Sequence, residues 1–391
     1  MSLTIKADLV KTLGAVAAAC DLVDLRLQNH GERVAYIALQ IGIHWGLDKD
    51  RLKRLALSSL IHDIGIVSTQ EKLELADFQP PGELVSHHAR RGHDLLVKTR
   101  FFKDLAQPVL EHHNNYTEEM DELGAIIHLA DRVENLLKRN EYVLWQVDTI
   151  LQRIIKHRGT TFHPDVVDCF VDLAQKPSLW LDLHTGNYAH ALRSDPDMTE
   201  TLGIDELEDI AELFATIVDS KSPFTACHSS GLAAKTKTMA QVLGYDKEHV
   251  RQLRVAALLH DIGKLAVSDS ILLSPNKLTP EEMAVMKQHT YHTYHLIGMI
   301  GDGLGDIQRW AAFHHERLDG SGYPFALSAA DLDTESRLLA VLDVFQALTE
   351  DRPYRPPLPL EKVALILRSE AEQNHLDPDL VELVLEHAEM L

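Results

Sequence analysis

The chain contains little cysteine, and this argues against two kinds of protein. Its 391 residues include three cysteines, Cys20, Cys169 and Cys227, and none of them forms a C-x-x-C pair. Such wide spacing is untypical of a disulfide framework or of a thiolate metal site. We therefore interpret the cysteines as reduced packing residues and expect a cytoplasmic protein.

Basic side chains and long apolar runs are also scarce. The 38 lysines and arginines face 59 aspartates and glutamates, which gives a formal net charge of −21. This balance argues against binding long nucleic acids, because phosphate contacts need basic patches, but it allows a small anionic ligand in a locally basic pocket. The apolar stretch at 16–20 is far shorter than the roughly 20 residues that cross a bilayer, so we expect no membrane contact. A dimer or a signalling-protein partner is left open.

Strand patterns are rare, and helical periodicity fills most segments. Apolar residues recur at intervals of three and four, as at Leu253, Ala256 and Ala257, and prolines fall mostly between such runs. The length suffices for two domains with their own cores. We predict an all-α fold of two tandem domains, residues 1–190 and 191–391, with the boundary in a turn-rich segment.

The two halves repeat one order of histidines and aspartates. In each half a single histidine precedes a His-Asp pair by 32 residues, and a further histidine, a His-His pair and an aspartate follow. The first set is His30, His62, Asp63, His88, His112, His113 and Asp131, and the second is His228, His260, Asp261, His289, His314, His315 and Asp343. The offset between the halves grows from 198 at the first histidine to 212 at the last aspartate. This pattern indicates a duplication followed by loss of a loop from the first half.

Five histidines and two carboxylates exceed the three or four ligands of a single zinc site. They suit two divalent metal ions bridged by an aspartate, an arrangement that activates water against a phosphodiester. Nitrogen and oxygen ligands without thiolates favour iron, manganese or another first-row ion over magnesium. We interpret other histidines, among them His190, His249, His292 and His295, as bystanders.

Further residues near the second set suit phosphate chemistry. Lys264 follows His260 by four residues and would share its helical face, so we predict catalytic roles for Lys264 and Asp261. A glycine-rich turn at 319–324 carries Tyr323 at its tip, where it would contact substrate. Arg352 and Arg355 would hold phosphates or stack on bases.

On these residues the second half resembles the HD-GYP family of cyclic-dinucleotide phosphodiesterases. The matching motifs are His228-Ser229, HDIGK at 260–264, His289, HHE-x-x-DG-x-GYP at 314–324, and D-x-F-x-ALT-x-x-RPYR from Asp343 to Arg355. The resemblance implies an all-helical HD fold with metals at the positions named. It also implies cleavage of a bacterial 3′,5′-cyclic dinucleotide to a linear one, with Lys264 contacting phosphate and Arg352 and Arg355 contacting substrate.

Two departures from the family pattern refine these expectations. Phe224 stands where some members carry a glutamate that supports a third metal, so we expect two metals. Gln346 stands where the family usually has aspartate. A carboxylate only accepts hydrogen bonds, which suits guanine, whereas glutamine also donates, which suits adenine. Cyclic di-GMP and 3′,3′-cyclic GMP-AMP are therefore both candidate substrates, and a packing role for Gln346 is the alternative.

The first half resembles a general HD domain that keeps its seven ligands and has lost its phosphate-handling groups. Ile66 replaces the lysine, and neither the G-Y-P turn nor R-P-Y-R is present. We predict a degenerate domain that packs on or regulates the second and whose seven residues could still bind metal; an independent phosphohydrolase of different specificity is the alternative. For the whole chain, the alternatives are hydrolysis of nucleotide monophosphates or guanosine tetraphosphate, and cyclic-dinucleotide sensing without turnover.

Overall fold

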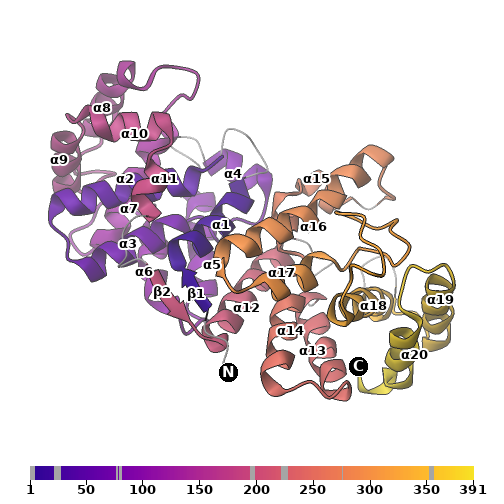
Figure 1. Ribbon diagram of the computed structural model, residues 1–391. Coiled ribbons are helices and arrows are strands. Elements are labelled where there is room, and N and C mark those ends of the chain that lie inside the picture. The colour runs from indigo at the N-terminus through magenta and orange to yellow at the C-terminus, as the bar shows by residue number, and fades with distance from the viewer. Residues whose placement is uncertain are drawn as a thin grey trace. The chain divides into compact units, whose positions relative to one another are not determined.

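The computed structural model describes residues 5–21, 28–75, 78, 82–193, 199–221, 228–274, 276–351 and 356–391. Helices make up nearly all of its regular structure (Figure 1), so the all-α prediction is confirmed. The chain divides into an N-terminal unit, Ala7–Glu200, and a C-terminal unit that joins Met1–Lys6 to Thr201–Leu391. The division lies at 200/201, whereas the sequence placed it at 190/191.

The N-terminal unit is built around α2, which packs against α3 and α7. Its helices are α1 (Leu9–Asp21), α2 (His30–Trp45), α3 (Lys49–Leu60), α4 (Thr69–Leu75), α5 (Gly82–Leu96), α6 (Ala106–Glu111), α7 (Glu122–Leu136), α8 (Val147–Ile155), α9 (Pro164–Leu173), α10 (Pro177–Thr185) and α11 (Tyr188–Arg193), with 3-10 turns at Lys103–Leu105 and Val143–Trp145. The Asp48 side chain caps α3 by accepting from the Arg51 backbone N–H. Gly42 lets α2 approach α3 closely, because a Cβ there would lie 2.8 Å from a methyl of Leu55.

The C-terminal unit packs α13 and α12 against α14. Its helices are α12 (Ile204–Ser220), α13 (His228–Val242), α14 (Lys247–Leu259), α15 (Asp269–Leu272), α16 (Pro280–Ile300), α17 (Gly305–Ala312), α18 (Thr334–Thr349), α19 (Leu360–Glu372) and α20 (Pro378–Glu386), with 3-10 turns at Ile262–Ala266 and Ala388–Met390. Asp246 caps α14, and Thr279 and Glu282 form a capping box at the start of α16. These caps fix where the helices that carry site residues begin.

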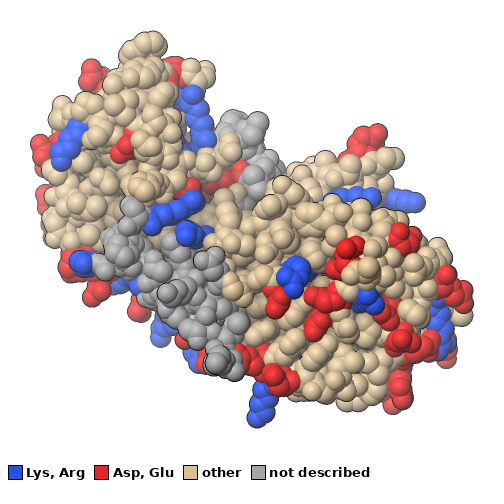
Figure 2. All heavy atoms as spheres, in the orientation of Figure 1, with Lys and Arg blue, Asp and Glu red and all other residues tan. Residues whose placement is uncertain are grey.

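Three short strands form a small sheet in the order β2-β1-β3. They are β1 (Ile5–Asp8), β2 (Thr199–Leu202) and β3 (Gly301–Asp302). Within the described ranges, no helix combines the length and the apolar character that crossing a bilayer would require. Figure 2 shows acidic side chains spread over the visible face with basic ones between them, in keeping with the net charge of −21.

The His-Asp pair lies in the same local structure in both units. Each pair follows the end of a helix, α3 in one unit and α14 in the other. A glycine two residues after each pair packs on the helix that carries the next histidine. A Cβ at Gly65 would lie 2.1 Å from the His88 carbonyl oxygen, and one at Gly263 would lie 1.9 Å from that of His289. Only glycine permits this approach, which brings the pair against the neighbouring histidine.

Candidate metal centres

The C-terminal unit gathers all seven predicted residues into one cluster. Asp261 lies at its middle, with Oδ2 3.1 Å from His260 Nε2 and Oδ1 3.5 Å from His289 Nε2 and 4.0 Å from His314 Nε2. Asp343 faces the other two histidines, with Oδ1 3.2 Å from His228 Nε2 and Oδ2 4.0 Å from His315 Nδ1. Side chains from α13, α16 and α18 and from the turns after α14 and α17 therefore converge on one point.

Backbone carbonyls orient the histidines of this cluster. The Nδ1–H groups of His260, His289 and His314 each donate to the carbonyl three residues earlier, at 2.7, 2.8 and 2.7 Å. This fixes the tautomer and leaves each Nε2 lone pair facing the cluster. Burial lowers the pKa of His289 to about 3, so its imidazole is neutral near pH 7 and able to bind a cation.

A carboxylate that the sequence did not single out orients the first histidine of each cluster. Glu350 Oε2 lies 3.1 Å from His228 Nδ1, and Glu134 Oε2 lies 2.7 Å from His30 Nδ1. Glu350 is seven residues after Asp343, whereas Glu134 is three residues after Asp131. Comparison of the two halves could not reveal these partners, because they do not occupy equivalent positions.

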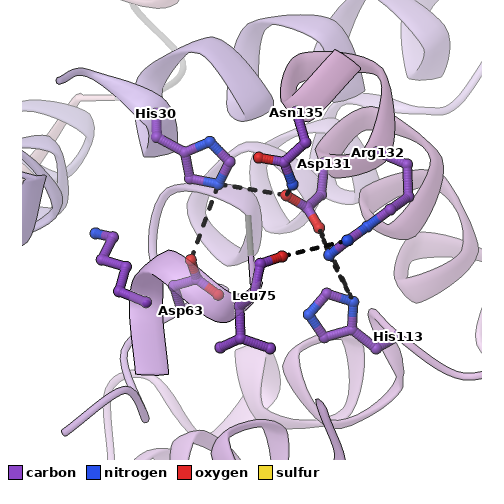
Figure 3. A pocket seen from close by; sticks show the side chains of 8 residues that line it. His30, Asp63, Leu75, His113, Asp131, Arg132 and Asn135 are labelled. Atoms are coloured by element: carbon purple, nitrogen blue, oxygen red, sulfur yellow. Dashed lines mark hydrogen bonds and ion pairs between the residues drawn. The ribbon is translucent and has the colours of Figure 1, made fainter. Parts of the chain in front are cut away.

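The N-terminal unit also brings its seven residues together (Figure 3 shows part of the cluster). Asp63 Oδ1 lies 3.5 Å from both His62 Nε2 and His88 Nε2, and Asp131 Oδ1 lies 3.3 Å from His30 Nε2. His62 Nδ1 donates to a backbone carbonyl three residues earlier, as His260 does. The seven residues of this unit therefore converge as their counterparts in the C-terminal unit do, and their arrangement alone does not show the predicted degeneracy.

The chemistry of both clusters fits a divalent cation. The histidine and aspartate atoms form groups whose members lie within 4.8 Å of one another: His30, His62 and Asp63; Asp63, His88, His112 and His113; His228, His260 and Asp261; and His289, His314 and His315. Buried His260 Nε2 and Asp261 Oδ1 make no hydrogen bond within the part of the chain that the structure describes. Such atoms are costly to bury without a partner, and a metal ion would satisfy them. The clusters thus suggest metal binding without identifying the metal.

The other predicted residues of the C-terminal site lie around this cluster. Lys264 Nζ is 2.5 Å from Asp261 Oδ2. The centre of the Tyr323 ring lies 5.0 Å from that of His315 and 6.4 Å from that of His289, and the Lys287 ammonium lies 5.1 Å from it. Arg352, Arg355 and the departure at Phe224 lie outside the described residues.

Gln346 is buried on α18 beside α13. A Cβ at Gly231 would come within 2.5 Å of the Gln346 amide nitrogen, so the amide packs closely against that helix. Its Oε1 makes no hydrogen bond among the described residues. These surroundings fit the packing role of Gln346. Because its Oε1 still lacks a partner, contact with a base of the substrate stays a prediction.

A positively charged side chain contacts a different aspartate in each cluster. In the C-terminal unit Lys264 binds Asp261, whereas in the N-terminal unit Arg132 Nη2 lies 2.5 Å from Asp131 Oδ2 (Figure 3). The side chain of His315 is 32% exposed, and that of its counterpart His113 is 5% exposed. The two clusters therefore have similar ligands but differ in which ligands solvent can reach.

Comparison with known proteins identifies the two units. Models of the HD domain match residues 27–136 and 212–380, so the prediction of two HD domains is confirmed. The chain is 32% identical over 391 aligned residues to 3′3′-cGAMP-specific phosphodiesterase 1 of Vibrio cholerae, covering 96% of this chain and 90% of that protein. It is 33% identical over 182 residues to a cyclic di-GMP phosphodiesterase of Thermotoga maritima, covering 46% of this chain and 49% of that protein.

A solved structure shares the fold. The crystal structure of a cyclic GMP-AMP specific phosphodiesterase of Vibrio cholerae, V-cGAP3, matches with a TM-score of 0.66 at 23% identity and covers 99% of both chains. The sequence match along nearly the whole chain gives the family. The chain belongs to the HD-domain family that includes cyclic-dinucleotide phosphodiesterases.

Proposed function

We propose that the C-terminal unit is a metal-dependent phosphodiesterase that hydrolyses a 3′,5′-cyclic dinucleotide to a linear dinucleotide. The position of Asp261 carries this proposal. One of its oxygens faces His260 and Lys264, and the other faces His289 and His314. A carboxylate placed between two histidine groups suits a pair of metal ions, and the adjacent ammonium suits an anionic substrate.

The seven residues of the C-terminal cluster would hold two divalent ions, with iron or manganese the best match to the ligands. Bound there, the ions would supply Lewis acidity and activated water for in-line attack on the phosphodiester. Burial raises the pKa of Asp261, but His260 and Lys264 outweigh that effect and hold it well below its ordinary value. Asp261 therefore stays ionised as a ligand across the physiological pH range.

Lys264 and Tyr323 would bind the phosphate that reacts. Lys264 is part-exposed on its 3-10 turn, so its ammonium can reach substrate while remaining near Asp261. Burial raises the pKa of Tyr323 above its ordinary value, so its phenol stays protonated and can donate to a substrate oxygen. Arg352 and Arg355 stay predicted substrate contacts.

We infer that 3′,3′-cyclic GMP-AMP is the preferred substrate, with cyclic di-GMP second. A relative that matches both units carries the former specificity in its name, whereas the Thermotoga maritima cyclic di-GMP phosphodiesterase matches under half of this chain. The glutamine at 346 agrees with a site that accepts adenine beside guanine.

The N-terminal unit is assigned no part in this hydrolysis. Ile66 stands where the C-terminal unit has Lys264, and Arg132 covers Asp131 and His113. The ligands are present, but the residue at the position of Lys264 carries no charge. We therefore assign this unit a structural or regulatory role.

The test is turnover by the full chain loaded with Mn²⁺ or Fe²⁺. We expect 3′,3′-cyclic GMP-AMP to give a linear dinucleotide, with slower cleavage of cyclic di-GMP and slower still of cyclic di-AMP. Nucleotide monophosphates and guanosine tetraphosphate serve as controls. Preferential hydrolysis of a control would replace the proposal with a general phosphohydrolase, and tight dinucleotide binding without cleavage would replace it with a sensor.

A further inference from the structure

An arginine lies inside the N-terminal metal-ligand cluster. Arg132 follows Asp131 on α7, and its side chain is 2% exposed. Its Nη2 donates to Asp131 Oδ2 at 2.5 Å and to His113 Nδ1 at 3.3 Å, and Nη1 donates to the Leu75 carbonyl at 3.3 Å (Figure 3). The guanidinium is therefore held in place on both of the ligands that it touches.

The C-terminal cluster has the same gap, and no arginine contacts it among the residues that the structure describes. His315 Nδ1 lies 4.0 Å from Asp343 Oδ2, and in the N-terminal unit His113 Nδ1 lies 3.9 Å from Asp131 Oδ2. The residue after Asp343 is Val344, which brings no charge. Within the described ranges, two nearly identical pairs of ligands thus differ by one buried guanidinium.

The hydrogen bond from Arg132 makes His113 unfit to bind a metal. A guanidinium has no acceptor and stays charged, so it can only donate, and His113 Nδ1 must accept. A neutral imidazole with an accepting Nδ1 carries its proton on Nε2, which in His113 makes no hydrogen bond among the described residues. Neither nitrogen then has a lone pair for a metal, and the fixed positive charge beside it repels a divalent ion.

Lys264 does not have this effect in the C-terminal cluster. It binds Oδ2 of Asp261 and leaves Oδ1 facing His289 and His314. Its side chain is 19% exposed, so it can move toward solvent or substrate when a metal binds. Arg132 is buried and donates a hydrogen bond directly to the predicted ligand His113.

We propose that Arg132 takes the place of one metal ion in the N-terminal unit, which therefore binds a single divalent ion on His30, His62 and Asp63. The guanidinium supplies fixed positive charge on the side of Asp131 and His113. This inference rests on the proposed function only in taking the C-terminal unit to bind two ions. It predicts that the two units load metal unequally although their ligand sets match.

The experiment measures the metal content of the full chain after loading with Mn²⁺ and removal of excess ions. The wild type should carry three ions per chain, and electron paramagnetic resonance should show one isolated Mn²⁺ beside one coupled pair. His113→Ala should leave the content unchanged, whereas the matched variant His315→Ala should lose one ion. Arg132→Val, which introduces the residue found at 344, should gain one ion.

Several outcomes would overturn the inference. Loss of an ion in His113→Ala would show that His113 binds metal. Two coupled pairs in the wild type would show that the N-terminal unit binds two ions. An unchanged content in a folded Arg132→Val, with folding checked by circular dichroism, would also contradict it; if that variant unfolds, the His113→Ala and spectroscopic results decide. Failure of the proposed function would give a different result. The wild type would then show no coupled pair in the C-terminal unit, while the single ion of the N-terminal unit would remain.

Discussion

The two units of this chain build the same cluster and surround it differently. Gly65 and Gly263 bring a His-Asp pair against a neighbouring helix in equivalent ways, and backbone carbonyls orient His62 and His260 alike. Yet one cluster has Lys264 on Asp261, and the other has Arg132 on Asp131. Equivalent backbone packing thus brings the same residue types together in both units, and we expect the different charged neighbours to give the two clusters different functions.

The largest expected difference comes from disabling each cluster in turn. His260→Ala with Asp261→Ala should reduce cyclic-dinucleotide turnover to background, because both groups of histidines lose their shared aspartate. His62→Ala with Asp63→Ala should leave most turnover intact. Steady-state rates and circular dichroism of both double variants check this. A folded second variant that loses activity would reverse the roles assigned to the units.

A smaller difference should follow from exchanging the charged neighbour. Lys264→Ile, which introduces the residue found at 66, should lower kcat by about 10²–10³-fold, as expected for loss of one group that stabilises transition-state charge. Its metal content should not change. The reverse change, Ile66→Lys, should add no turnover, since Arg132 still covers the N-terminal cluster. An unaltered kcat in Lys264→Ile would remove the catalytic role of this lysine.

The carboxylates that orient His228 and His30 allow a matched pair of milder substitutions. Glu350→Gln and Glu134→Gln should each weaken metal binding in their own unit by about 10–100-fold, the usual effect of losing a partner that orients a ligand. Calorimetric titration with Mn²⁺ measures both. Only Glu350→Gln should also lower turnover, and an equal loss in Glu134→Gln would argue that the two units act together.

The smallest expected effect concerns which nucleotide base the substrate site prefers. Gln346→Asp should shift the ratio of kcat/KM toward cyclic di-GMP, by roughly tenfold if the side chain makes one good contact worth about 1–3 kcal/mol. Competition between the two dinucleotides in one reaction measures the ratio directly. A constant ratio would leave Gln346 with the packing role that its position beside Gly231 supports.

Repetition explains what the sequence could predict. Helical periodicity predicted the fold, and the repeated order from His30 to Asp131 and from His228 to Asp343 singled out the residues that converge. The repeat did not predict a role for Arg132, because the corresponding residue after Asp343 is the uncharged Val344. Nor did it predict Glu134 and Glu350, because their positions differ between the halves.

The small sheet shows a different limit of prediction. Its strands, at most four residues each, come from three distant segments of the chain. Strands that short carry too little alternation to be recognised, and their pairing depends on the tertiary fold.

Metal removal and reloading of the wild-type chain tests whether hydrolysis depends on divalent ions. Chelator-treated protein is incubated with 3′,3′-cyclic GMP-AMP before and after addition of Mn²⁺ or Fe²⁺, and the product is identified by mass. We expect no cleavage without metal and release of a linear dinucleotide once the C-terminal unit is filled. Cleavage that proceeds without metal, or an intact ligand after full loading, would contradict this expectation.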